Sequence, residues 1–153
     1  MNRVFTDGSV FHNRSAGGWA AVINGTTLSG SEHTTNNFRM ELLAVVSAME
    51  HMEPGSQAVI YTDDLFIVKR GNRIVAAKDS RMPKSEQDLW ERFTKAAQGK
   101  LIGLKHLEAG TKKDCQEHNA AHQAAREAAF KIMSFEERVA STREAGAVER
   151  GDT

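Results

Sequence analysis

Three acidic residues lie at positions from which their side chains could converge on one site. Asp7 ends a short apolar run in residues 4–9, and Asp63 ends a similar run in residues 59–64. Both lie at predicted strand ends, whereas Glu41 lies early in a segment with apolar residues at helical spacing. Converging carboxylates repel one another and raise each other's pKa unless cations neutralise them. Because oxygen ligands suit Mg²⁺ or Mn²⁺, the pattern predicts a divalent metal site.

The elements that must position these acids follow in a regular order. Turn signals and a helix between the first and fourth strands predict an antiparallel opening followed by parallel strands. We expect a polar turn over residues 8–16 and a hairpin at Asn24-Gly25. The predicted class is α/β, with a mixed five-stranded sheet flanked by helices. The predicted strands cover residues 4–6, 17–23, 26–32, 58–62 and 101–107.

Helix boundaries are predicted from caps and breakers. The helix with Glu41 begins at residues 34–37, and a second helix begins at Leu65 and ends near Gly71. A third follows Pro83, with Ser85 as its cap, and a long helix covers residues 114–133. Asp64 is expected to cap a helix rather than to join Asp63 in the site. Trp19 and Trp90 each fall on an apolar face, which predicts core positions.

Composition restricts the class of protein. The chain has 153 residues, zero formal net charge and a single cysteine, Cys115. We expect one domain over residues 1–133 and a charged extension over residues 134–153, helical and then frayed. One cysteine excludes an intramolecular disulfide and fits a reducing compartment. With no apolar run long enough for a membrane and no secretory signal expected, we predict a cytoplasmic protein.

The motifs resemble ribonuclease H of type 1. They are T-D-G-S at residues 6–9, T-T-N-N-F-R-M-E-L-L-A at residues 34–44 and Y-T-D-D at residues 61–64, in this order. The resemblance extends from about Asn2 to about Ala129. It implies the ribonuclease H-like fold and carries the family's metal-binding acids onto Asp7, Glu41 and Asp63.

The same resemblance implies an activity. Proteins similar to this one are endonucleases that hydrolyse the RNA strand of RNA–DNA hybrids and leave 5′-phosphate products. Two Mg²⁺ or Mn²⁺ ions bridge the scissile phosphate, because an attacking hydroxide needs positive charge around an anionic target. The expected partner is the RNA–DNA hybrid. We expect the protein to act as a monomer and not to associate with a membrane.

The fourth acid of the family is where this sequence departs from the pattern. Laid without gaps on Ala109-Gly110, the family's loop pattern places His118 at the aspartate position and Glu108 at the loop histidine. A longer loop would place His122 there instead. Asp114, His118 and His122 are spaced to share one helix face. Neutral imidazole is a metal ligand, so the site is Asp-Glu-Asp-His, or else three carboxylates with surface histidines.

Substrate contacts follow from the resemblance too. Asn36 and Asn37 resemble a pair that contacts RNA 2′-hydroxyls, although Phe38 adds a residue between them and Glu41, and a helix cap is the alternative. Backbone groups around Gly8 and Ser9 would contact ribose. The stretch 69–84 is expected to be irregular and to offer phosphate contacts, with a solvated loop as the alternative. Its substrate-binding candidates are Arg73, Lys78, Arg81 and Lys84.

Two other functions stay open at this point. A Holliday-junction resolvase shares the nuclease fold and accommodates a histidine in its last acidic position, but the asparagine pair favours 2′-hydroxyl recognition. A catalytically silent hybrid-binding module would explain the changed fourth position, but the three carboxylates Asp7, Glu41 and Asp63 count against it.

Overall fold

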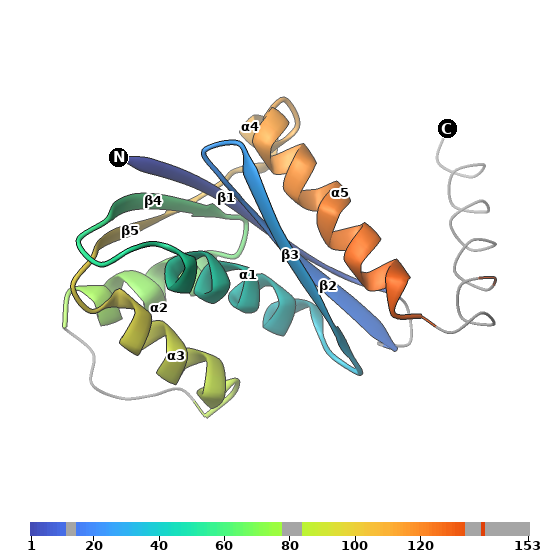
Figure 1. Cartoon of the computed structure of the whole chain (residues 1–153), viewed down its shortest axis with the longest axis horizontal. Helices are drawn as coiled ribbons and strands as arrows, with labels where there is room; N and C mark the ends of the chain where they lie inside the picture. The colour runs from blue at the N-terminus through green and yellow to red at the C-terminus, as the bar shows by residue number, and fades with distance from the viewer. Residues whose placement is uncertain (12–14, 78–83, 134–138, 140–153) are drawn as a thin grey trace.

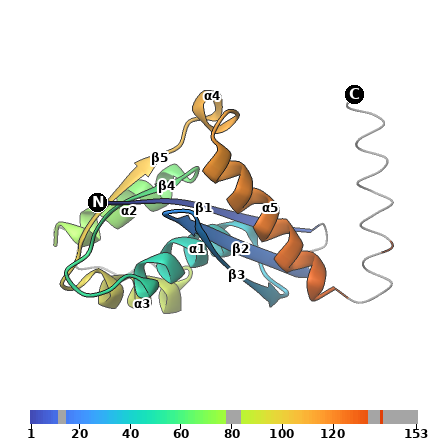
Figure 2. The same cartoon turned by 45° about the horizontal axis from the view of Figure 1, so that its top comes forward.

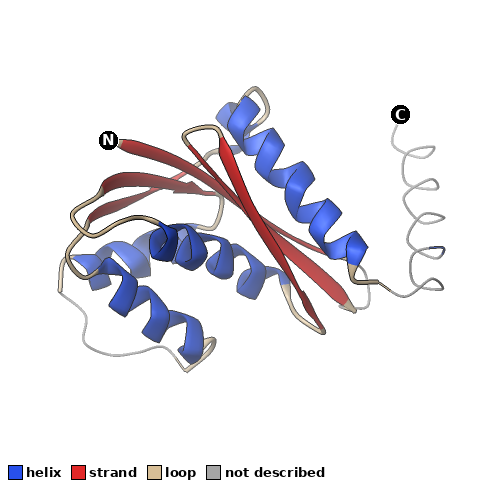
Figure 3. Cartoon of the chain, viewed as in Figure 1, coloured by secondary structure: helices blue, strands red, loops and turns tan. Residues whose placement is uncertain are grey.

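The computed structural model describes residues 1–11, 15–77, 84–133 and 139. Strands and helices alternate after an opening of three strands, and helices lie on both sides of one sheet (Figures 1 and 3). The elements are β1 (Asn2–Val10), β2 (Ala16–Ile23), β3 (Thr26–His33), α1 (Asn37–His51), β4 (Gln57–Thr62), α2 (Leu65–Val75), α3 (Gln87–Ala97), β5 (Leu101–His106), α4 (Ala109–Lys112) and α5 (Gln116–Lys131). The predicted α/β class is confirmed.

Strand β1 is the centre of the sheet. The strand order is β3-β2-β1-β4-β5, antiparallel from β3 to β1 and parallel from β1 to β5, as predicted. The turn expected over residues 8–16 is wrong in extent, because β1 pairs with β2 as far as Val10 opposite Gly17. The second hairpin is confirmed: Asn24 and Gly25 have φ of 48° and 85°, as a tight two-residue hairpin turn requires.

The start of α1 is fixed by one polar residue and one arginine. Asn36 caps the helix by accepting the Arg39 N–H at 2.8 Å, and its Nδ2 donates to Glu86 at 3.3 Å. The Arg39 guanidinium contacts Glu32, Glu86 and Asp88 at 2.6 to 2.8 Å. These carboxylates raise the Arg39 pKa, with the hydrogen bond to Asp88 as the largest cause. The end of β3 and the starts of α1 and α3 are therefore held together.

The helices divide between the two faces of the sheet. Helices α1, α2 and α3 cover one face, and α5 crosses the other (Figures 1 and 2). Trp90 and Phe93 lie fully buried in the larger core, on the α1 side. Trp19 is partly buried against the same core, so both tryptophans pack as predicted. On the α5 side, β2 contributes Ala20 and Val22 to a smaller cluster.

Two predicted helix boundaries are wrong. Helix α2 does not end near Gly71, which is buried against Phe93 and Leu104, but continues to Val75. The stretch that begins at Lys69 is therefore helical at first, and not irregular. Helix α3 is preceded by Glu86 at φ 58°, and not by a Ser85 cap.

The end of the domain also differs from the prediction. Helix α5 begins at Gln116, and the separate short helix α4 lies between it and β5. Asp114 therefore precedes the helix that carries His118, and the two do not share a helix face. The predicted extension over 134–153 lies, except for residue 139, outside the described residues and stays a prediction. Among the described helices, none is long and apolar enough to span a membrane.

A close contact between β1 and α1 brings the first two acids together. A Cβ added at Gly8 would lie 2.6 Å from the Glu41 backbone nitrogen and 2.8 Å from the Met40 carbonyl carbon. Such distances are shorter than van der Waals contact, so only glycine allows α1 to approach β1 this closely. Because Asp7 precedes Gly8, this contact also sets the distance between the two carboxylates.

We expect Gly8→Ala to lower the free energy of unfolding by about 1–3 kcal/mol, as overpacked sites do. The measurement is urea unfolding followed by circular dichroism. Gly103→Ala in β5 is the matched control, because its added Cβ meets no atom within 4 Å; that change should stay within about 0.5 kcal/mol. Equal effects of the two substitutions would contradict the close-contact argument.

Candidate active site

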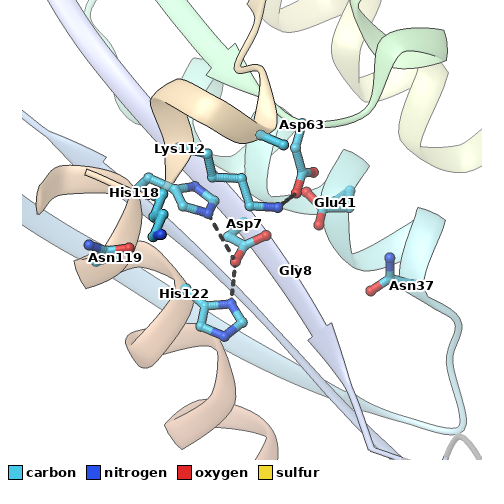
Figure 4. A pocket seen from close by; sticks show the side chains of 11 residues that line it. Asp7, Gly8, Asn37, Glu41, Asp63, Lys112, His118, Asn119 and His122 are labelled. Carbon is cyan, nitrogen blue, oxygen red and sulfur yellow. Dashed lines mark hydrogen bonds and ion pairs between the residues drawn. The ribbon is translucent and has the colours of Figure 1, made fainter. Parts of the chain in front are cut away.

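The three acids and one histidine meet at a single cavity. It has a volume of about 390 Å³ and lies where β1, α1, the end of β4 and the α4–α5 segment come together (Figure 4). Asp7, Glu41, Asp63 and His118 all contribute to its wall. The other lining residues are Gly8, Asn37, Ala109, Lys112, Lys113, Asn119 and His122.

The adjacent acids Asp63 and Asp64 have different tasks. Asp63 follows the end of β4 and faces the cavity. Asp64 caps α2, because its side chain accepts the Ile67 N–H at 3.0 Å. The predicted cap role of Asp64 is confirmed.

Glu41 carries the strongest electrostatic perturbation of the site. Its side chain and that of Asp7 are buried, each residue being 3 % exposed. Burial raises the pKa of Glu41 well above its ordinary value, and the neighbouring charges of Asp7 and Asp63 raise it further. The direction of this pKa shift agrees with the repulsion expected of converging carboxylates. Its Oε2 is buried and has no hydrogen-bond partner among the described residues.

His118 lies at the fourth corner of the cluster. It is 3 % exposed, and its Nε2 lies 4.0 Å from Asp7 Oδ2. That separation is too long for a hydrogen bond but suits two ligands of one ion. Burial, the largest cause, lowers the pKa of His118, so the imidazole is held in the neutral form that binds metals.

His122 contacts the same carboxylate in a different way. It lies one helical turn after His118, its side chain is half-exposed, and its Nδ1 lies 2.7 Å from Asp7 Oδ2. A carboxylate only accepts hydrogen bonds, so Nδ1 carries the hydrogen when Asp7 is ionised. His122 thus orients Asp7 with this nitrogen, whereas His118 leaves Nε2 directed at the cluster (Figure 4).

Lys112 is a site residue that the sequence analysis missed. Its Nζ donates to Asp63 Oδ2 at 2.9 Å, from the last residue of α4. This hydrogen bond, with the charges of Asp63, Asp7 and Glu41, raises the Lys112 pKa against the opposing effect of burial. The only signal in the sequence was the pair Lys112-Lys113 shortly before the histidine helix.

The residues present fit a divalent metal. Asp7, Asp63 and His118 each offer a ligand atom, and these atoms lie within 4.8 Å of one another. The unpartnered Oε2 of Glu41 adds a further oxygen beside them. Two or three oxygens with one imidazole form a donor set for Mg²⁺ or Mn²⁺, with more nitrogen character than carboxylates alone.

Only some of the predicted substrate-binding residues line the cavity. Gly8 and Asn37 line the cavity, and Asn36 is engaged as the cap of α1, as its alternative role required. Ser9 lies in β1, Arg73 lies in α2, and Lys84 is exposed before α3; none of these three is among the described residues that line the cavity. Lys78 and Arg81 lie outside the described residues.

Two further acids near the cavity take no part in its wall. Glu108 is exposed at the residue before α4, and Asp114 is exposed between α4 and α5. Neither is among the described residues that line the cavity. That Glu108 replaces the loop histidine therefore stays a prediction without a contact to support it.

Comparison with known proteins agrees with this geometry. The ribonuclease H family model, described as RNase H, matches residues 2–130. The chain belongs to the ribonuclease H family, type 1. Membership supports nuclease activity of the ribonuclease H kind and the use of a divalent metal.

Individual relatives match between 43% and 81% of this chain. The chain is 34% identical over 113 residues to a ribonuclease HI of Xylella fastidiosa, covering 64% of this chain and 73% of the relative. It is 30% identical over 136 residues to a ribonuclease H of Nitrobacter hamburgensis, covering 81% of this chain and 88% of the relative. A ribonuclease H of Neorickettsia sennetsu is 42% identical over 72 residues, 43% and 48% of the two chains.

The raised pKa of Glu41 has a consequence for stability. Between the unfolded and folded pKa values, the folded protein holds a proton that the unfolded chain has released, so stability falls as pH rises through this window. We expect Glu41→Gln, which removes the charge and keeps the size of the side chain, to raise the melting temperature in EDTA near pH 8. The rise should be roughly 2–4 °C for each kcal/mol of relieved repulsion, and it should shrink toward about pH 4.

Glu50→Gln on the same helix is the matched control for this experiment. Its hydrogen bond to Arg92 lowers the Glu50 pKa, so the substitution should not stabilise the protein at neutral pH. If the two variants melt alike, burial of Glu41 does not carry the predicted penalty.

Proposed function

We propose that this protein is an endonuclease that hydrolyses the RNA strand of RNA–DNA hybrids and leaves 5′-phosphate products. The observation that carries the proposal is the convergence of Asp7, Glu41, Asp63 and His118 on one cavity, in a chain of the ribonuclease H family. We further propose that the active species is a monomer in a reducing, cytoplasmic compartment, to which the single cysteine is suited.

Asp7, Asp63 and His118 would hold two Mg²⁺ or Mn²⁺ ions together with Glu41. The bound ions would supply positive charge beside the scissile phosphate and lower the pKa of a coordinated water. Asp7 is kept in position by its hydrogen bond to His122 and by its place in the central strand. Burial favours the neutral form of His118, and the close contact at Gly8 keeps Glu41 near Asp7, so the ligands are arranged before the substrate arrives.

Substrate positioning is assigned to groups at and near the cavity. Gly8 and Asn37 line it and are proposed to contact ribose, together with Ser9 and Asn36 nearby. The basic residues Arg73, Lys78, Arg81 and Lys84 are proposed to contact phosphates, which hold the duplex without reading its sequence. Zero net charge gives the chain no bulk attraction for nucleic acid, so such local contacts must supply it.

One cleavage assay tests the function. Purified protein is incubated with labelled RNA–DNA hybrid, double-stranded RNA or a four-way DNA junction, each with Mg²⁺, Mn²⁺ or EDTA. We expect metal-dependent cleavage of the hybrid alone, and a loss of at least about 100-fold in Asp63→Asn, since even partners of metal ligands are worth about 10- to 100-fold.

Asp64→Asn is the matched control for that variant, because Asp64 caps α2 and does not face the cavity. An asparagine side chain also caps helices, so this variant should cleave like the wild type. Cleavage of the junction would support a resolvase instead, and binding of the hybrid without cleavage would indicate a silent module.

The assignment of His118 as fourth ligand predicts a pH dependence. A ligand imidazole must be neutral, and burial lowers the pKa of His118, so cleavage should persist below the ordinary histidine value of about 6.5 and then fall. We expect His118→Ala to lose most activity at low metal and to regain part of it at high Mn²⁺. His118→Asp should stay active at still lower pH. The measurement is kcat/KM for the hybrid against pH and metal concentration.

His122→Ala tests the alternative alignment in the same assay. It removes a hydrogen bond to Asp7 and not a ligand, so its effect should be smaller than that of His118→Ala. The opposite ranking would favour the longer-loop alignment. Wild-type activity in both variants would leave a site of three carboxylates.

A further inference from the structure

Lys112 places a positive charge at the edge of the carboxylate cluster. Its ammonium lies 2.9 Å from Asp63 Oδ2, the side chains being 38% and 25% exposed. Asp63 is also one of the three residues whose ligand atoms lie within 4.8 Å of one another. One carboxylate therefore belongs both to an ion pair within the chain and to the candidate metal site (Figure 4).

These two roles of Asp63 oppose each other. A divalent ion at Asp63 would lie within a few ångströms of the ammonium, and two cations so close repel strongly in a partly buried cavity. The lysine side chain has a flexible four-carbon stem, so Nζ can move away from Asp63 without any change in the α4 backbone. That backbone is fixed by the Lys112 N–H, which donates to the Glu108 carbonyl at 2.8 Å.

We propose that Lys112 is a tethered counter-ion that occupies the Asp63 edge of the site in the metal-free protein and that a divalent ion must displace. The inference rests on the proposed metal site. This gives Lys112 two effects. The lysine stabilises the crowded carboxylates when no metal is bound. It also lowers the affinity for metal, because its ion pair with Asp63 must be broken before the ion binds.

Lys113 provides a matched control. It is the next residue, it lines the same cavity and it carries the same charge. No ion pair joins its side chain to a carboxylate in the part of the chain that the structure describes. A general effect of charge on metal affinity should therefore be similar at both positions, whereas direct competition at Asp63 should appear only at Lys112.

The test measures Mn²⁺ binding by isothermal titration calorimetry and melting temperature in EDTA, for wild type, Lys112→Met, Lys113→Met and Lys112→Arg. We expect Lys112→Met to bind Mn²⁺ about fivefold more tightly than Lys113→Met, the factor that corresponds to a partly exposed ion pair at the upper end of its usual strength. Lys112→Met should also melt at a lower temperature without metal. Lys112→Arg keeps the charge and should resemble wild type in both measurements.

Asp63→Asn separates this inference from the proposed function. If that variant loses Mn²⁺ binding but Lys112→Met binds no more tightly than Lys113→Met, the metal site stands and the counter-ion role of Lys112 is wrong. If Asp63→Asn binds Mn²⁺ like wild type, the metal site itself is wrong and the inference is overturned with it. Tighter binding only in Lys112→Met, together with its lower melting temperature, would support the inference.

Discussion

The structure depends on the close contact between β1 and α1 at Gly8. A helix that packs on a sheet is normally held away by the side chains between them, but here the strand has no side chain at the contact. Glu41 consequently lies beside Asp7, and both residues are buried, which disfavours their charged forms. The same contact joins the two elements that belong to opposite sides of the site, the central strand and the first helix.

Burying these acids together is unfavourable without a cation. Side chains of the protein itself stabilise two of the three acids. His122 holds Asp7 from α5, and Lys112 holds Asp63 from α4. Glu41 Oε2 has no hydrogen-bond partner among the described residues, and burial, together with the charges of Asp7 and Asp63, raises the Glu41 pKa. The protein's own groups thus neutralise the cluster only in part, so grouping these acids opposes stability, as is common where residues are selected for function.

If His118 is the fourth ligand, as proposed, it changes the chemistry of the site rather than removing it. A carboxylate at that position would add another negative charge to a cluster in which the pKa of Glu41 is already raised. A buried neutral imidazole would supply a ligand atom without that charge. The cost is proton sensitivity, because an imidazole is lost as a ligand at a pH where an aspartate remains ionised.

Much of the fold and the acidic core of the site followed from local patterns in the sequence. The strand before Asp63, the helical spacing around Glu41 and the Asn24-Gly25 turn each depend on a few neighbouring residues, and these predictions agree with the structure. Asp64 was placed as a cap for the same reason. Side-chain periodicity and turn chemistry are local properties, so a sequence displays them directly. Asp7 was expected at a strand end, but it lies within β1, opposite Ala20 of β2.

Only the tertiary structure decided which groups contact the acids. The length of β1 depends on pairing with β2, and the continuation of α2 past Gly71 depends on packing against α3 and β5. Lys112 is distant from Asp63 in sequence, and it meets that acid because α4 follows β5 beside the end of β4. The sequence offered His118 and His122 as alternatives, since one helical turn separates them. Their different distances from Asp7 are set by how α5 lies across the sheet: His122 lies within hydrogen-bond distance and His118 farther away, which supports the proposed assignment of His118 as the ligand.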